Sequence, residues 1–318
     1  LDFESAQEAY PESGLPEAAE YPGGEDRLRW HIREGIATFQ RHFGYEPAGC
    51  WPAEGAVSEG TLRILGEAGF AWAATGEGVL GHSLGKKYDK YGADVRHSLC
   101  HPYRTPGTRT ACFFRDDELS DLIGFQYAQW HADDAVANLI HRLETIAETV
   151  ADHPDAVVPI ILDGENAWEH YPENGFHFLS GLYRKLVDHP ALEVTTFQEC
   201  TEAKVHTNKL SHLVAGSWVY GTLSTWMGDK DKNRGWDMLV DAKRAYDRVV
   251  AAGTLDEEAL AAATRQLGIC EGSDWFWWFG DYNPADIVRD FERLYRLHLS
   301  RLYRLLGEEP PEYLAHTF

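Results

Sequence analysis

Basic residues are scarce in this sequence. Its 318 residues include 29 Lys and Arg against 51 Asp and Glu, which gives a formal net charge of -22. Nucleic acids and anionic membrane surfaces are both bound through basic faces. We therefore expect no nucleic acid and no membrane as partner, and the charge instead fits a neutral or cationic ligand.

Long apolar runs and closely spaced cysteines are also missing. No apolar run approaches the length of a membrane span, and no signal peptide is visible. The five cysteines are widely spaced, odd in number and without a CxxC pair. This usage predicts reduced thiols and a cytoplasmic protein. The chain begins at Leu1 and not at Met, so the question of an upstream targeting segment stays open.

A metal centre has little support in the sequence. HExxH is absent, and His97, Cys100 and His101 in HSLCHPY have no second ligand cluster with matching spacing. We therefore predict no metal and no cofactor, and we expect neither nucleotide binding nor Ser-His-Asp chemistry.

Tryptophan, by contrast, is plentiful, with 11 residues in a chain that is 13% aromatic. At that density Trp often provides flat platforms on which sugar rings stack, but it equally fills core volume. Composition alone favours core packing for most of the 11.

Apolar patterns predict strands that alternate with helices in the first two thirds of the chain. The strands are expected at 48–51, 70–75, 111–114, 156–162 and 192–197, and the helices at 26–43, 59–68, 132–150 and 176–188. Residues 1–25 read as an irregular lead-in. Alternation of this kind predicts an α/β fold with parallel strands.

The pattern changes to helices alone in the last third. They are expected at 236–252, 256–268 and 284–306, and no strand is evident after residue 200. We place a boundary near residue 205, with an α/β part over 1–205 and a helical bundle over 206–318.

Two carboxylates follow predicted parallel strands directly. Glu54 comes after the strand at 48–51 and Asp163 after the strand at 156–162. The carboxyl ends of parallel strands are where α/β folds gather their catalytic groups. A carboxylate pair there suits glycoside hydrolysis. The alternative is that each acid caps the following helix.

Several motifs resemble glycoside hydrolase family 57, close to its α-amylase and amylopullulanase-like members. GCWPAEGAVS, LDGENAWEHYPENG and CEGSDWFWWFGD look like three of its blocks, and FRDDELSDLIGFQYAQW and LSTWMGDKDKNRGWDML are also similar to family segments. The resemblance implies a retaining enzyme that acts on the α-1,4 bonds of α-glucans, and it leaves open whether α-1,6 bonds are also cleaved. It assigns Glu54 as the nucleophile and Asp163 as the general acid/base.

The first two family blocks, including the His-Gln-Pro motif, have no counterpart here. The resemblance implies an incomplete (β/α)7 barrel, represented by its C-terminal strands, followed by a helical bundle that completes the substrate cleft. The missing N-terminal half of the catalytic unit is then an expected partner. Two interpretations stay open: an active glycosidase or glucanotransferase, and an inactive α-glucan-binding fragment.

Further residues are candidates for sugar contacts, each with a structural alternative such as core packing or a salt-bridged helix start. They are Trp51, Arg115, Asp121, Glu165, Trp168, Trp226, Asp274, Trp275 and Trp277. We expect SDWFWWFGD to form a loop in which Phe276 and Trp278 pack inward. The side chains of Trp275 and Trp277 are then available to contact a sugar.

Overall fold

The computed structural model describes residues 3–85, 95–164 and 168–317, and the chain divides into two compact units. Unit 1 combines residues 1–46 with 222–318, and unit 2 comprises residues 47–221. This division differs from the expected one near residue 205. The first 46 residues are grouped with the C-terminal helices, partly because the backbone N–H groups of Glu17 and Ala18 donate to the Asp237 carboxylate.

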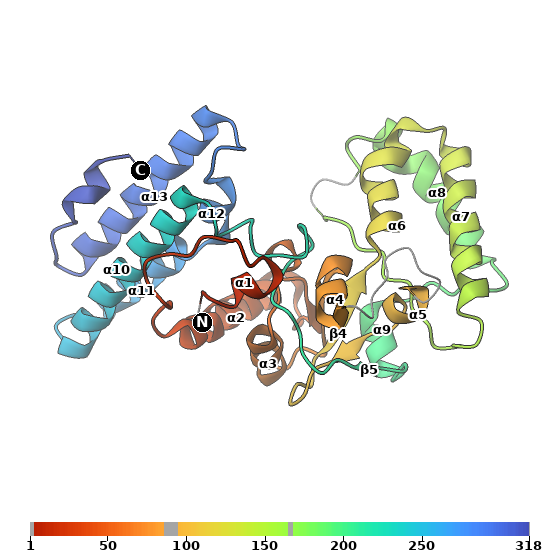
Figure 1. Ribbon diagram of the computed structural model, residues 1–318, viewed down its shortest axis with the longest axis horizontal. Helices are drawn as coiled ribbons and strands as arrows, with labels where there is room; N and C mark the ends of the chain where they lie inside the picture. The colour runs from red at the N-terminus through yellow and green to blue at the C-terminus, as the bar shows by residue number, and fades with distance from the viewer. Residues whose placement is uncertain (1–2, 86–94, 165–167, 318) are drawn as a thin grey trace. The chain divides into compact units, whose positions relative to one another are not determined.

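Unit 2 is an α/β unit (Figure 1). Its strands are β1 (Gly49–Cys50), β2 (Trp72–Gly76), β3 (Tyr103–Arg104), β4 (Ala111–Arg115) and β5 (Asn208–Lys209). Its α-helices are α3 (Glu59–Glu67), α4 (Glu77–Leu84), α5 (Val95–Leu99), α6 (Asp117–Asp121), α7 (Ala132–Thr149), α8 (Phe176–Val187) and α9 (Phe197–Glu202). Short helical turns are η1 (Ala53–Gly55), η3 (Leu122–Gln126), η4 (Tyr127–Gln129) and η5 (Pro172–Gly175).

The strands form one sheet in the order β1-β2-β4-β3-β5. β1 pairs with β2, β2 with β4, and β3 with β5, all in parallel, whereas β3 and β4 are antiparallel. Every residue of β4 is buried, as expected for a strand between two neighbours. The mostly parallel α/β arrangement predicted from the apolar pattern is therefore confirmed.

Two apolar clusters hold unit 2 together. One lies on the sheet, where the Phe113 and Phe197 rings stack with centroids 4.2 Å apart. The other joins α6, α7 and α8 around Tyr127 and Phe178. The helix boundaries follow local signals: the Ser58 hydroxyl accepts from the Thr61 N–H at the start of α3, as predicted.

Two predicted strands are absent from the structure. Residues 156–162 belong to no strand in the described part of the chain, because Pro159 has no N–H to donate to a ladder. The segment is instead held by single contacts, such as the Asp116 N–H to the Pro159 carbonyl at 2.8 Å. Residues 192–196 are also outside any strand, since Thr196 forms a capping box that starts the unpredicted helix α9. β5 lies in the region where no strand was expected.

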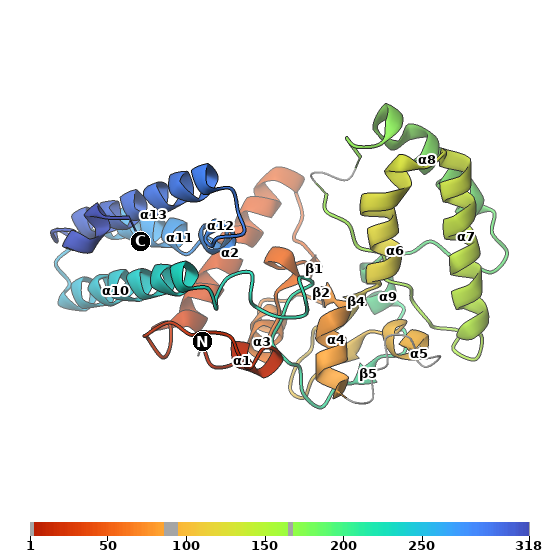
Figure 2. The same cartoon turned by 45° about the horizontal axis from the view of Figure 1, so that its top comes forward.

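Unit 1 is helical throughout the part that the structure describes. Its elements are α1 (Ala6–Ala9), α2 (Gly24–Phe43), α10 (Lys230–Ala252), α11 (Glu257–Cys270), α12 (Ser273–Trp278), α13 (Ala285–Leu305) and η6 (Glu312–Ala315). α10, α11 and α13 pack against one another and run side by side (Figures 1 and 2). The four long helices match the predicted ones, although α10 starts six residues before the predicted 236.

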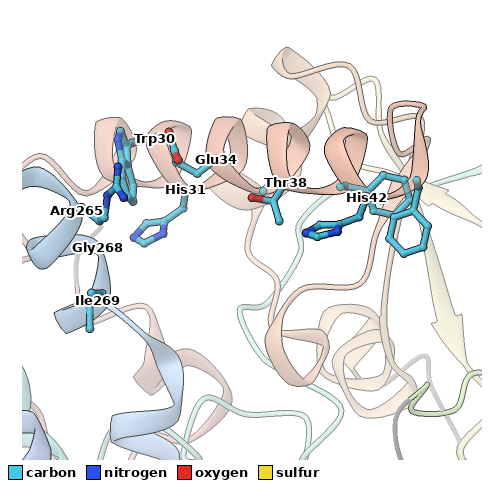
Figure 3. A pocket seen from close by; sticks show the side chains of 11 residues that line it. Trp30, His31, Glu34, Thr38, His42, Arg265, Gly268 and Ile269 are labelled. Carbon is cyan, nitrogen blue, oxygen red and sulfur yellow. The ribbon is translucent and has the colours of Figure 1, made fainter. Parts of the chain in front are cut away.

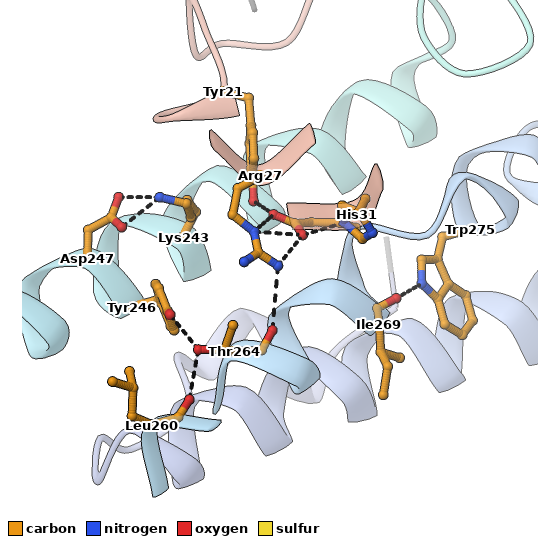
Figure 4. Close-up of polar contacts among 11 residues, drawn as sticks. Tyr21, Arg27, His31, Lys243, Tyr246, Asp247, Leu260, Thr264, Ile269 and Trp275 are labelled. Carbon is orange, nitrogen blue, oxygen red and sulfur yellow. Dashed lines mark hydrogen bonds and ion pairs between the residues drawn. The ribbon is translucent and has the colours of Figure 1, made fainter. Parts of the chain in front are cut away.

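A buried polar network joins α2 to the end of α11. The Glu271 carboxylate accepts from the Tyr21 hydroxyl at 2.5 Å, from Arg27 through two nitrogens, and contacts His31 Nε2 at 2.8 Å. Figure 4 shows Tyr21, Arg27 and His31 directed at this one carboxylate. Because Glu271 is the residue at the C-terminal end of α11, the network holds that end of α11 against α2.

The expected loop at SDWFWWFGD is wrong for residues 273–278, which form α12. The Lys232 ammonium donates to the carbonyls of Phe276 and Trp277 at the end of α12, where a cation stabilises the helix. Phe276 is buried as expected.

All five cysteines are free, in agreement with the predicted reduced state. Among the described helices, none is both long and apolar enough to cross a membrane.

Candidate functional site

The carboxyl ends of β1, β2 and β4 bring the chemically capable residues of unit 2 to one edge of the sheet. The three strands are parallel neighbours, so the residues that follow them converge. Glu54 follows β1, Glu77 follows β2, and Arg115 ends β4. Asp163 follows the extended segment 156–162. Arg115 is joined to that segment by a hydrogen bond of 3.0 Å from its Nε to the Ile161 carbonyl.

Glu54 is held in an unusual backbone conformation. Its φ of 49° lies in the left-handed region, which a residue with a Cβ rarely adopts. Its Oε2 accepts a hydrogen bond from the indole Nε1 of Trp218, and its carbonyl accepts from the Trp218 N–H at 3.1 Å. The side chain is half-buried. Both the backbone and the carboxylate of Glu54 are therefore positioned by Trp218.

The segment that carries Trp218 is itself fixed to the turn around Glu54. Val57 and Gly216 exchange two backbone hydrogen bonds, of 2.8 and 3.1 Å, in an antiparallel bridge. The Trp51 ring then meets the Trp218 ring edge-on, with centroids 5.4 Å apart. Trp51 also lies over Gly55, where an added Cβ would come within 2.7 Å of its ring. The two indoles thus form a rigid wall beside Glu54.

Arg115 sits on the other side of Trp218. Its guanidinium lies 4.7 Å from the Trp218 ring centroid, a cation–π contact. The same group forms ion pairs with Asp117 at 2.9 Å and Asp121 at 2.7 Å. The Arg115 side chain is 4% exposed, so its charge is compensated by two carboxylates in a buried setting.

A small pocket of about 170 Å³ opens between these groups. It is lined by Arg115, Gly124, Phe125, Leu162, Asp163, His170 and Trp218. Trp218 therefore contacts Glu54 and also lines the pocket that contains Asp163. Trp218 is thus the residue that contacts Glu54 and shares a pocket with Asp163, whereas Glu54 does not itself line that pocket.

A third carboxyl group next to this pocket has a shifted pKa. Burial raises the pKa of Asp117 to about 6, and the charges of Glu77 and Asp121 raise it as well, whereas Arg115 lowers it. Asp117 does not line the pocket itself.

The other predicted contacts of unit 2 occupy different surroundings. Trp168 packs against Tyr171 and Phe178, with centroids 5.4 and 6.3 Å away, as part of the helical core cluster. Asp121 contributes to the site through its ion pair with Arg115. Glu165 lies outside the described residues.

The predicted contacts of unit 1 are divided between the core and the surface. Trp226 is buried and accepts a hydrogen bond at its carbonyl from the Trp236 indole. The Trp275 indole donates to the Ile269 carbonyl at 2.8 Å (Figure 4), and its ring packs on α13. Trp277 is half-buried against Trp278, and Asp274 is exposed at the start of α12.

Trp218 was missed by the sequence reasoning. It stands between Gly216 and Gly221 in a stretch without helical or strand periodicity, so its only signal was an aromatic residue between glycines. Both glycines are required by close packing, since a Cβ on Gly216 would lie 2.3 Å from the Gly221 carbonyl oxygen.

Two glycine patterns also escaped the sequence reasoning, and the structure explains why neither forms its usual site. Residues 76–81 read Gly-x-Gly-x-x-Gly directly after β2, which resembles a dinucleotide loop. However, a Cβ on Gly76 would lie 2.4 Å from Trp218 Cα, and a Cβ on Gly78 would lie 3.0 Å from Gly221 Cα. The chain itself fills the space that a pyrophosphate needs.

The second pattern is Gly-x-Ser-x-Gly at residues 81–85, the form of a nucleophile elbow. Ser83 lies inside α4, where its hydroxyl donates to the Val79 carbonyl at 2.7 Å and accepts from the Val214 N–H. Its hydroxyl therefore joins α4 to the backbone of residue 214.

Unit 1 contains a wider, open groove of about 850 Å³ along α2 and α11. Figure 3 shows Trp30, His31 and His42 on α2, with Arg265 and Ile269 on α11. None of the predicted site residues that the structure describes lines this groove.

Comparison with known proteins identifies the family and the fold. A sequence profile of glycosyl hydrolase family 57 matches residues 4–213. A GH57 branching enzyme from Thermococcus kodakaraensis shares 17% identity and a TM-score of 0.66, covering 93% of this chain and 64% of that one. A GH57-type branching enzyme from Pyrococcus horikoshii gives 16% identity, a TM-score of 0.67 and coverage of 90% and 69%.

The α-amylase AmyC from Thermotoga maritima is similar to the same extent, with 16% identity, a TM-score of 0.66 and coverage of 90% and 64%. At these identities the similarity shows a shared fold. The chain spans 64% of the length of the Thermococcus enzyme.

Proposed function

Because the chain belongs to glycosyl hydrolase family 57, we propose that it is a retaining glycoside hydrolase or transglycosidase that acts on α-glucans. Its sheet would then represent part of an incomplete (β/α)7 barrel. The observation that carries the proposal is the indole of Trp218, which donates to Glu54 and lines the pocket that contains Asp163. Structures titled as branching enzyme, α-amylase and 4-α-glucanotransferase share this fold, which supports an α-glucan as the substrate.

Glu54 is assigned as the nucleophile. The indole N–H of Trp218 orients the Glu54 carboxylate for attack on the anomeric carbon, because a hydrogen bond to a charged acceptor is strong and directional. Attack forms a glycosyl–enzyme ester and breaks the glycosidic bond. A backbone held at positive φ is often found at functional sites, which agrees with this role.

Asp163 is assigned as the acid/base. In the first step its carboxyl gives a proton to the departing glycosidic oxygen, and in the second step its carboxylate takes a proton from the acceptor. Arg115 lines the same pocket, and its charge is shared with Asp117 and Asp121 in ion pairs.

The acceptor determines the outcome of the second step. Water gives hydrolysis, and a sugar hydroxyl gives transfer or branching. The pocket of about 170 Å³ is smaller than the about 300–1,000 Å³ typical of whole-ligand sites. It therefore suits a single sugar ring next to the carboxylates, and the longer glucan extends beyond it.

The test compares the unaltered chain with Glu54→Gln and Asp163→Asn on amylose and on pullulan. Reducing ends are counted and products are separated by chain length, so that hydrolysis and transfer are both detected. We expect a loss of activity of at least about 1,000-fold for Glu54→Gln, since no covalent intermediate can form. Glu67→Gln, an exposed carboxylate on α3, is the matched control and should retain full activity.

A fluorinated glucosyl donor distinguishes the two roles. The unaltered chain should gain the mass of one glucosyl unit on the peptide containing Glu54, and Asp163→Asn should still gain it when the leaving group needs no proton. Full activity in Glu54→Gln, or inversion at the anomeric carbon, would refute the mechanism. If the unaltered chain neither hydrolyses nor transfers glucan, the proposal fails for this chain.

A further inference from the structure

Four histidines from distant parts of unit 2 lie together, and none of them lines the pocket described above. They are His97 in α5, His101 before β3, His153 after α7, and His206 before β5. The ring centroids of His97 and His153 are 5.2 Å apart, those of His101 and His153 5.2 Å, and those of His101 and His206 5.5 Å.

The backbone fixes this assembly. Residues 103 and 208 are partners in the parallel pair of β3 and β5, so His101 and His206, each two positions earlier, lie alongside each other. The loop after α7 is joined to the same place by the Val157 N–H, which donates to the Cys100 carbonyl at 2.8 Å. Figures 1 and 2 both show α5 close to β5. The histidines therefore meet because of the sheet register, and not through a flexible surface.

Asp152 lies between two of the rings. Its Oδ1 is 3.4 Å from His97 Nε2, and its Oδ2 is 3.6 Å from His153 Nε2. One ligand atom from each of the three residues lies within 4.8 Å of the others. Zinc binds nitrogen and oxygen at about 2.0–2.2 Å, so neighbouring donors of a tetrahedral site are about 3.3–3.6 Å apart. The two observed distances fall at or near this spacing, each to a different oxygen of the Asp152 carboxylate.

A second, independent observation concerns His101. This residue is 3% exposed, and its Nδ1 is buried without a hydrogen-bond partner among the described residues. Buried polar atoms are nearly always paired, and an exception calls for an explanation such as an ion. The ring next to it is that of His153, which already faces Asp152.

We propose that His97, Asp152 and His153 bind a divalent transition-metal ion, that Zn²⁺ is the best match, and that His101 supplies the fourth donor. Three imidazoles with one carboxylate suit zinc, whereas Mg²⁺ and Ca²⁺ prefer oxygen ligands. A four-ligand site of this kind is closed and structural. It ties α5, the loop after α7 and the start of β3 to one point.

The site is tested by metal binding, which is independent of glucan activity. Protein without a histidine tag is freed of metal with chelator and titrated with ZnCl₂ against a chromophoric chelator, and bound zinc is counted by mass spectrometry. We expect one Zn²⁺ per chain and a rise in Tm that MgCl₂ does not produce. Absence of stoichiometric zinc binding would overturn the proposal.

Single substitutions then assign the ligands. His97→Gln and His153→Gln should each weaken zinc binding at least tenfold. Asp152→Asn should do the same, and its side chain is 71% exposed, so the fold is not at risk. The control is His131→Gln, because His131 and Asp133 form an exposed pair 3.9 Å apart on the same unit; its affinity should be unchanged.

The fourth ligand has its own variant. His101→Gln should weaken zinc binding at least tenfold, and the zinc-induced rise in Tm should disappear with it. Unchanged affinity in His101→Gln would overturn the assignment of His101, and unchanged affinity in Asp152→Asn would overturn the site.

Discussion

Replacing Glu271 with Gln removes the charge at the centre of the buried network in unit 1. The carboxylate side chain is 7% exposed and binds the Arg27 guanidinium through two nitrogens, at 2.8 and 2.7 Å. Gln is nearly the same size, but its NH₂ group faces donors from Arg27, Tyr21 or His31. The substitution therefore leaves a buried guanidinium without its counter-ion.

The expected cost follows from this geometry. Breaking a buried ion pair by removing one partner typically lowers the free energy of unfolding by about 3–5 kcal/mol. For a unit of this size that corresponds to a fall in Tm of about 6–20 °C. Glu258→Gln, an exposed carboxylate on the same helix α11, should change the free energy of unfolding by less than about 0.5 kcal/mol.

The loss should also depend on pH. Burial would raise the pKa of Glu271, but hydrogen bonds from His31 and Arg27 outweigh burial and lower the pKa below its usual 4.5. The unfolded chain then binds the proton more readily than the folded chain, so the contribution is fully present above about pH 4.5 and is lost as the pH falls through the folded-state pKa. Scanning calorimetry between pH 3 and 7 measures both effects. A loss under about 1 kcal/mol at pH 7, or one that does not shrink in acid, would refute the reasoning.

Three further substitutions test the positioning of the site and of α12. Trp218→Phe removes the indole N–H that donates to Glu54, and a hydrogen bond to a charged acceptor is worth about 1.5–3 kcal/mol. The substitution should therefore lower kcat/KM on amylose about 10- to 150-fold. An unchanged kcat/KM would contradict the orienting role of Trp218. Gly76→Ala places a Cβ 2.4 Å from Trp218 Cα and should lower both the free energy of unfolding, by about 1–3 kcal/mol, and the activity. Lys232→Met leaves the carbonyls of Thr225 and Phe276 without their donor. It should lower the free energy of unfolding, measured with urea, by about 2–4 kcal/mol. An unchanged free energy of unfolding would show that water replaces the ammonium.

Helices were the most predictable part of the fold. α2, α7 and α13 were expected because apolar residues recur along one face over 18 to 21 residues, and such a pattern repeats the same signal several times. The short strands β1 and β2 were also located to within about two residues. The segment 156–162 was misread as a strand, because an apolar run records burial but not whether a neighbouring strand accepts its hydrogen bonds.

The two carboxylates of the candidate site could be proposed from the sequence, whereas the residue that supports Glu54 could not. Glu54 and Asp163 follow apolar segments and carry recognisable motifs. Trp218 is 164 positions from Glu54, and no local pattern links the two. Likewise, the sequence offered His97 and His101 as an incomplete metal motif, and only the tertiary structure brings Asp152 and His153, from the loop after α7, next to them.

The sequence by itself determined most of the helices, the α/β character and the family, and it offered Glu54 and Asp163 as candidates, because each depends on residues close together in the chain. Tertiary structure decided which indole holds Glu54, which carboxylates compensate Arg115, that Glu271 joins α2 to the end of α11, and that the glycine patterns around α4 are filled by the chain itself. These outcomes depend on contacts between residues tens to hundreds of positions apart, whose geometry is set by strand register and packing.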